Sequence, residues 1–287
     1  MTRSSLKYLL VGILVGVLTG GVITAGAATT PKCTTTTPAA HAKTTKKKKA
    51  AKKHKATAKK KATAKKKAKK KKAKKKKPVV PAPVVTGETM NGLFKINPGT
   101  YDATTGAKGS YLRMVLAGGS LDKGPYFSNP SSPGGTYTLV SPGTDGGLLT
   151  EAYQEPPAKP FSLTGDALAN RFMAPQRFTA ILFSASTSAR DPQTGINVPP
   201  PHIVNNGGKL SGQTQAVSAE WNRGFFNQGS PKPDGTSPGL TTPVHGTYDA
   251  ATKAYTLDWS SAIVGGPFNG FTGIWHLEGT FEQRCAA

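Results

Sequence analysis

The sequence predicts an all-β fold for residues 86–284, a single sandwich or barrel-like domain of antiparallel strands with long Gly/Pro loops. Glycine, proline, serine and threonine recur every several positions, and no long amphipathic helical pattern is present. Several segments instead alternate apolar and polar residues with the period of a half-buried strand. About 200 residues are enough for one sizeable core.

The first element, residues 1–28, is an apolar N-terminal segment. Arg3 and Lys7 precede an uncharged run that is as long as the roughly 20 residues needed to cross a bilayer. A small-x-small site ends at Ala27, so the segment is expected to be a signal peptide cleaved there, or else a signal-anchor transmembrane helix. Small residues recur at every fourth position from Gly12 to Ala28, which would allow a homodimer through the uncleaved helix.

The charges that flank this segment point in two directions. More lysines follow it than precede it, which favours a cytoplasmic tail, but the Thr-rich spacer at residues 29–42 carries only Lys32 close to the segment. We expect export of everything after Ala28. The domain would then lie outside the cell membrane, or be secreted if the segment is cleaved, and the cytoplasm-facing orientation stays open.

Residues 43–77 form a Lys/Ala tract with 22 lysines in 35 positions. Such a segment has too little apolar surface to fold alone and is predicted to be disordered. The chain has no Asp or Glu before residue 78, whereas the domain has 13 Lys and Arg against 14 Asp and Glu and is nearly neutral. The anion-binding residues of the tract are expected to include Lys46, Lys47, Lys48, Lys49, Lys59, Lys60, Lys61, Lys69, Lys70, Lys71, Lys72, Lys74, Lys75, Lys76 and Lys77.

The tract has no aromatic residue on which a base could stack, so sequence-specific binding of nucleic acid is not expected. In composition it resembles the Lys/Ala tails of linker histones, bacterial histone-like proteins and heparin-binding adhesins, which implies a polyanionic partner. We expect phospholipid, wall polymer or glycan if the tract is exported, and the inner leaflet or DNA if it is not. A solvated spacer without a partner is the remaining interpretation.

Two short features frame the domain. The Pro-rich linker at residues 78–85 should form a stiff polyproline-like connection. Cys33 and Cys285, the two cysteines of the chain, could pair in an exported protein, within one chain or between two, or remain free thiols.

Strands are predicted at residues 111–116, 136–140, 178–185, 255–259 and 273–282, the last with Trp275, Leu277 and Phe281 on one face. A repeated segment, residues 99–105 and 246–252, suggests two hairpins in which Asp102 and Asp249 bond the following amides in Asx turns. Residues 118–135, 191–209 and 224–244 are predicted as long loops.

Trp221, Phe225 and Phe226 are candidates for an aromatic ligand platform, although such aromatics are more often core. No nucleophile elbow, zinc-protease helix, phosphate loop or calcium loop is present, and no cofactor or metal is expected. The scattered histidines are His202, His245 and His276, and the carboxylates that glycoside hydrolysis would need are sought among Glu151, Asp166, Asp191 and Glu220.

The sequence therefore favours a membrane-tethered or secreted cell-envelope protein. Its β-domain is displayed for binding, and its polycationic tract holds anionic surfaces. The enzymatic alternative, which the sequence favours less, is a secreted, glycan-directed hydrolase tethered by its basic tail. A cytoplasm-facing membrane protein that tethers the nucleoid or DNA is the second alternative.

Overall fold

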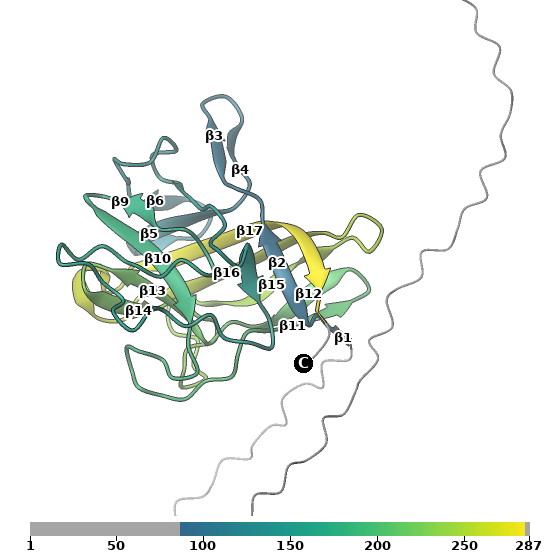
Figure 1. Cartoon of the computed structure of the whole chain (residues 1–287). Coiled ribbons are helices and arrows are strands. Elements are labelled where there is room, and N and C mark those ends of the chain that lie inside the picture. The colour runs from purple at the N-terminus through teal and green to yellow at the C-terminus, as the bar shows by residue number, and fades with distance from the viewer. Residues whose placement is uncertain (1–86, 285–287) are drawn as a thin grey trace, which may run out of the picture. The chain divides into compact units, whose positions relative to one another are not determined.

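The computed structural model describes residues 87–284. Strands account for 49% of the interpretable region, no α-helix occurs in it, and its curled antiparallel sheets form a half-barrel (Figure 1). The predicted all-β class is confirmed. No helix within residues 87–284 is long and apolar enough to cross a membrane. The predicted N-terminal helix, Thr-rich spacer, Lys tract and Pro-rich linker lie outside the described residues.

The main sheet follows the order β1-β11-β12-β15-β16-β17-β2-β8, and β5 adds to it by pairing with β17, β6 and β7. Its strands are β1 (Glu88–Thr89), β2 (Gly92–Ile96), β5 (Tyr111–Ser120), β6 (Gly124–Tyr126), β7 (Thr138–Leu139), β8 (Gly147–Leu149), β11 (His202–Asn206), β12 (Lys209–Gln213), β15 (Thr242–Tyr248), β16 (Ala254–Ala262) and β17 (Thr272–Gln283).

A second sheet has the order β14-β13-β10-β9, and β3 and β4 form a separate hairpin that projects from the body in Figure 1. These elements are β3 (Thr100–Asp102), β4 (Gly106–Lys108), β9 (Gln176–Phe178), β10 (Ile181–Thr187), β13 (Val217–Trp221) and β14 (Gly224–Asn227), and a short 3-10 turn η1 covers Gly266–Phe268.

The long strand β17 organises the main sheet. Its first half pairs with β5, from Thr272 opposite Val115 to His276 opposite Tyr111, and its second half pairs with β2. Its other edge pairs with β16 over nine consecutive residues. One strand therefore joins β16, the strand before it in the sequence, to β2 and β5 from the start of the domain.

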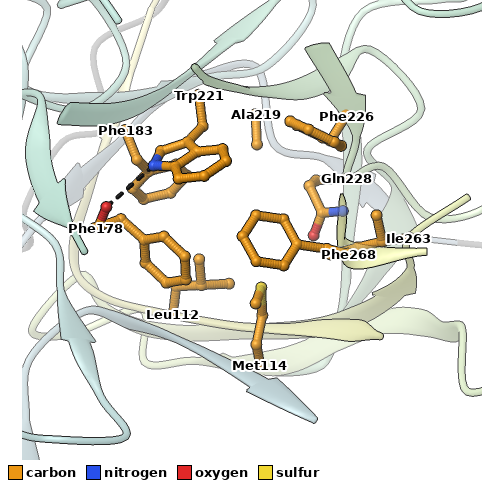
Figure 2. A pocket seen from close by; sticks show the side chains of 10 residues that line it. All are labelled: Leu112, Met114, Phe178, Phe183, Ala219, Trp221, Phe226, Gln228, Ile263 and Phe268. Carbon is orange, nitrogen blue, oxygen red and sulfur yellow. Dashed lines mark hydrogen bonds between the residues drawn. The ribbon is translucent and has the colours of Figure 1, made fainter. Parts of the chain in front are cut away.

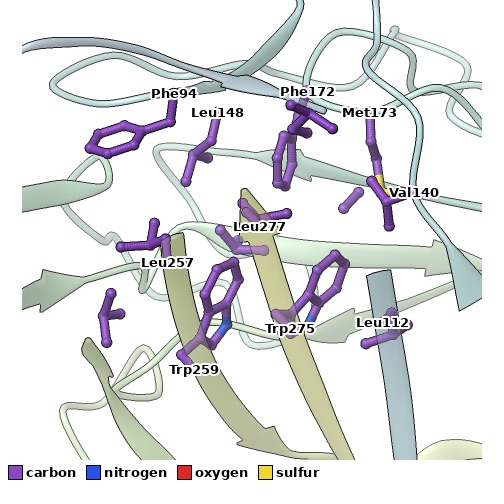
Figure 3. Close-up of a cluster of buried hydrophobic side chains, with 14 of the residues drawn as sticks. Phe94, Leu112, Val140, Leu148, Phe172, Met173, Leu257, Trp259, Trp275 and Leu277 are labelled. Carbon is purple, nitrogen blue, oxygen red and sulfur yellow. The ribbon is translucent and has the colours of Figure 1, made fainter. Parts of the chain in front are cut away.

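The core lies between the main sheet and the smaller one. Trp259 and Trp275 stand side by side on β16 and β17, with their rings parallel and 5.6 Å apart (Figure 3). Trp275 also packs against Phe183 of β10 and against Phe172. Trp275, Leu277 and Phe281 are buried on one face of β17, so the predicted alternation of that strand is confirmed.

Both copies of the repeated segment form hairpins with the expected turns. The Asp102 carboxylate accepts from the amides of Thr104 (2.9 Å) and Thr105 (2.8 Å), and these bonds lower the pKa of Asp102. Asp249 does the same for Ala251 and Thr252, both at 2.8 Å. The Asx-turn predictions are confirmed.

Other segments differ from the sequence predictions. The apolar stretch at residues 178–185 is not one strand, because Thr179 adopts φ 57° and turns the chain between β9 and β10. The predicted strand at residues 136–140 is reduced to β7. The three predicted long loops contain short strands, including β6, β11 and β14, and Gly207 and Gly208 supply the positive φ angles of the tight turn between β11 and β12.

Candidate functional site

An apolar pocket lies between the two sheets (Figure 2). Its volume is about 30 Å³, whereas small-molecule sites usually have about 300–1,000 Å³. This is smaller than the roughly 150 Å³ of an apolar cavity that holds benzene. The lining residues are Leu112, Met114, Phe178, Phe183, Ala219, Trp221, Phe226, Gln228, Ile263 and Phe268.

The three aromatic residues of the predicted ligand platform lie on two faces of the small sheet. Trp221 and Phe226 line the apolar pocket, and the Trp221 indole N–H donates to the carbonyl of Phe178 at 3.0 Å. Phe225 points to the opposite face and packs edge-to-face on Phe161 at 5.2 Å. Adjacent residues of a strand alternate between its faces, so Phe225 and Phe226 do not share one surface.

The four candidate carboxylates are each held by local contacts. Glu151 bonds His202 at 2.6 Å, and Asp166 bonds the hydroxyl of Thr164 at 2.6 Å. Asp191 and Glu220 are buried, with 1% and 0% exposure. The structure therefore places two of the four out of reach of a polymeric substrate.

The three histidines do not meet. His202 pairs with Glu151, the Nδ1 atom of His245 lies 3.1 Å from the carbonyl of Pro243, and His276 contacts Asp258 and Glu278. In residues 87–284, no group of three or more His, Cys, Asp or Glu side chains is placed to hold a metal ion.

The most distinctive surface lies on β5 and on segments next to it, namely β3, β6 and the residue before β7, on the face of β5 turned away from the core. We call it the outer tyrosine cluster, and it comprises Tyr101, Tyr111, Tyr126, Tyr137 and Arg113. Tyr111 meets Tyr137 edge-to-face at 5.0 Å, and Tyr101 of the projecting hairpin lies 6.2 Å from Tyr137. Alternation along β5 explains the surface, because Leu112 and Met114 point into the core while Tyr111 and Arg113 point out.

Arg113 lies at the centre of the cluster. Its guanidinium carbon is 3.4 Å from the centre of the Tyr126 ring and 4.3 Å from that of Tyr137. Both distances are within the range of a cation–π contact. Its Nε atom is buried and has no hydrogen-bond partner in the described part of the chain. The guanidinium group is thus held by rings rather than by acceptors.

His276 extends this surface across the sheet. Its ring stacks on Tyr111 at 4.8 Å, its Nδ1 atom lies 2.6 Å from Asp258, and its Nε2 atom lies 3.6 Å from Glu278. Burial disfavours the charged imidazole, but the hydrogen bonds and charges of Asp258 and Glu278 outweigh it and raise the pKa of His276. The protonated imidazole offsets one of the two carboxylate charges, so this compact ion cluster keeps one negative charge.

From the sequence, His276 was named among the scattered histidines, but the tyrosines and Arg113 were missed. The only local indication of this surface was the alternation at residues 111–116, in which every second side chain is expected to face away from the core. Tyr126 and Tyr137 lie on other segments, so their approach to Arg113 depends on the pairing of β5 with β6 and β7.

The remaining predicted site residues lie outside the described residues, namely the Lys tract, the cleavage site at Ala27, and Cys33 and Cys285. Fold and surface together define an all-β half-barrel with an aromatic outer face. The chain matches no protein-family model, and no curated protein or solved structure is significantly similar to it.

Proposed function

We propose that this chain is a membrane-tethered or secreted cell-envelope protein whose β-domain is a binding module. The proposal for the whole chain rests on its sequence, in which an apolar N-terminal segment and a polycationic tract precede a nearly neutral domain. Residues 29–42 and 78–85 serve as spacer and linker, and the barrel-like domain is the part displayed.

The observation that carries the binding role is the outer tyrosine cluster. Tyrosine and arginine are the residue types most enriched at recognition surfaces, because they offer large contact areas that end in polar groups. Here four tyrosines and one arginine without an ion-pair partner among the described residues gather on one face. The domain therefore has a surface suited to contact and no preformed small-molecule cavity in the apolar pocket.

The domain's role is tested with residues 85–287 on glycan arrays and on insoluble wall material. We expect binding without release of product, and we expect Tyr101→Ala to weaken it about tenfold, because Tyr101 is the most exposed tyrosine of the cluster, at 39%. Tyr153→Ala is the matched control, since the hydroxyl of Tyr153 bonds Val198 outside the cluster.

Two results would count against this role. Release of sugar product would favour the alternative of a secreted hydrolase tethered by its tail. Binding that Tyr101→Ala and Tyr153→Ala reduce equally, or no binding at all, would remove the cluster as the contact surface.

The Lys tract is proposed to hold anionic surfaces by counterion release. A peptide of residues 43–77 should bind heparin or anionic vesicles, with an affinity that falls about a thousandfold between roughly 50 and 200 mM salt if six or more charges are neutralised. Fluorescence anisotropy across a salt series measures the slope. Binding that is absent, or independent of salt, would contradict the proposal.

A further inference from the structure

The guanidinium group of Arg113 is charged and is held in place by aromatic rings, but it lacks an anionic partner. No carboxylate of the described residues forms an ion pair with it, and its Nε–H has no acceptor there. Charged groups that are withdrawn from water are usually paired. Arg113 is half-buried, and only its Nε atom is among the buried side-chain atoms without a partner in residues 87–284.

The surroundings keep this group in place without an acceptor. The Tyr126 ring lies over the guanidinium carbon at 3.4 Å and is itself fixed by a 2.8 Å bond from its hydroxyl to the carbonyl of Leu121. Tyr137 contacts the same guanidinium group at 4.3 Å and also meets Tyr111. A fork held in this way loses little conformational freedom when it binds an oxyanion in a bidentate manner.

The nearby acids are bound by groups other than Arg113. Asp258 and Glu278 are the nearby acids, and both are engaged by His276. Glu278 also accepts the amide of Gly109 at 3.1 Å. Both carboxylates are thus held by contacts with groups other than Arg113, and the guanidinium group keeps no ion-pair partner in residues 87–284.

We infer that the outer tyrosine cluster is a subsite for an acidic sugar, in which a uronate carboxylate pairs with Arg113 and the sugar ring lies against a tyrosine of the cluster. The inference rests on the proposed binding role and names its ligand class. Planar carboxylates fit the guanidinium fork, and aromatic rings offer apolar faces to the C–H groups of a sugar. Tyr137 contacts the guanidinium group, and Tyr101 lies 6.2 Å from Tyr137.

The test is a titration of the full chain, labelled with ¹⁵N, with methyl β-D-glucuronide and with its neutral counterpart methyl β-D-glucoside. We expect saturable shifts of the backbone amides of Tyr111, Arg113 and Tyr137, with the glucuronide binding at least about tenfold more tightly. Reading individual amides separates this site from the lysine tract, which attracts any anion.

Arg113→Lys keeps the charge but removes the fork, and it should weaken glucuronide binding about tenfold or more. Arg171→Lys is the control, because Arg171 is exposed and already paired with Asp145 at 3.0 Å. Acetate and inorganic phosphate serve as oxyanions without a sugar ring.

The inference is overturned if glucuronide and glucoside bind alike, if Arg113→Lys has no effect, or if acetate and phosphate bind as well as the glucuronide. Should Arg113→Lys fail to fold, the comparison of the two sugars on the unaltered chain still decides. Tyr101-dependent binding to wall material that persists in a folded Arg113→Lys variant would refute the uronate subsite alone. If the unaltered chain shows no binding that depends on Tyr101, the proposed function itself is refuted.

Discussion

Replacement of Trp275 by alanine is expected to lower the free energy of unfolding by about 4 kcal/mol. The indole is fully buried, stacks on Trp259 at 5.6 Å and packs against Phe183. Its N–H donates to the side-chain oxygen of the buried Gln228 at 3.2 Å, so alanine leaves both a large cavity and an acceptor without its donor. Urea unfolding followed by far-UV circular dichroism measures the loss.

Trp221→Ala is the matched control. Trp221 is only half-buried and lies at the edge of the apolar pocket, so its removal should cost clearly less than that of Trp275. Equal losses for the two variants would mean that Trp275 is not at the centre of the core. The free energy of unfolding of Trp275→Phe should lie between those of the wild type and Trp275→Ala, because phenylalanine keeps most of the ring volume.

The stability of the domain is expected to pass through a minimum between about pH 7 and 8, because two buried groups are costly to charge. Burial raises the pKa of Glu220 to about 7, despite a hydrogen bond from Ser186. Burial lowers the pKa of Lys232 to about 8, although Asp191 and Asp234 oppose this shift. The Nζ atom of Lys232 donates to Ser261 at 2.7 Å and to the carbonyl of Asn227 at 2.9 Å.

The two groups act on opposite sides of the minimum. Glu220 binds its proton more tightly in the folded state. Its stabilising contribution to the free energy of unfolding is therefore fully present below about pH 4.5 and is lost as the pH rises through about 7. Lys232 binds its proton less tightly in the folded state, so its contribution is present above about pH 10.5 and is lost as the pH falls through about 8. Each shift corresponds to about 3 kcal/mol.

The Glu220→Gln variant isolates the part of the pH dependence of stability that comes from Glu220. The variant should match the wild type near pH 4.5 and be more stable by about 2–3 kcal/mol near pH 8, because glutamine keeps the acceptor for Ser186 but carries no charge. Urea titrations at both pH values measure the difference. The exposed Glu155→Gln is the control, and a Glu220→Gln variant that is less stable than the wild type at pH 8 would contradict the assignment.

Local pattern was sufficient for part of the fold. Alternation predicted β16 and β17 and the buried side of each, because successive side chains of a strand point to opposite faces. Asp102 and Asp249 predicted their turns, because the carboxylate bonds amides two and three residues further on. The break at Thr179 was missed, because its positive φ is not encoded by a glycine or asparagine.

The candidate site was less accessible to this reasoning. The proposed aromatic platform grouped Phe225 with Phe226 by proximity in the sequence, yet neighbours in a strand face opposite ways. Arg113 gave no signal of its own, because its environment comes from Tyr126 and Tyr137 on strands or loops that follow it.

By itself, the sequence determined the all-β class, the segregation of positive charge into residues 43–77, and the near neutrality of the domain. These depend on composition and on spacings of a few residues. Only the tertiary structure decided that β17 joins both β5 and β2, that Trp259 stacks on Trp275, and that Arg113 lies among tyrosines without an acid. The physical reason is that alternation fixes which face a side chain takes, whereas the choice of neighbouring strand is made by the packing of the whole core.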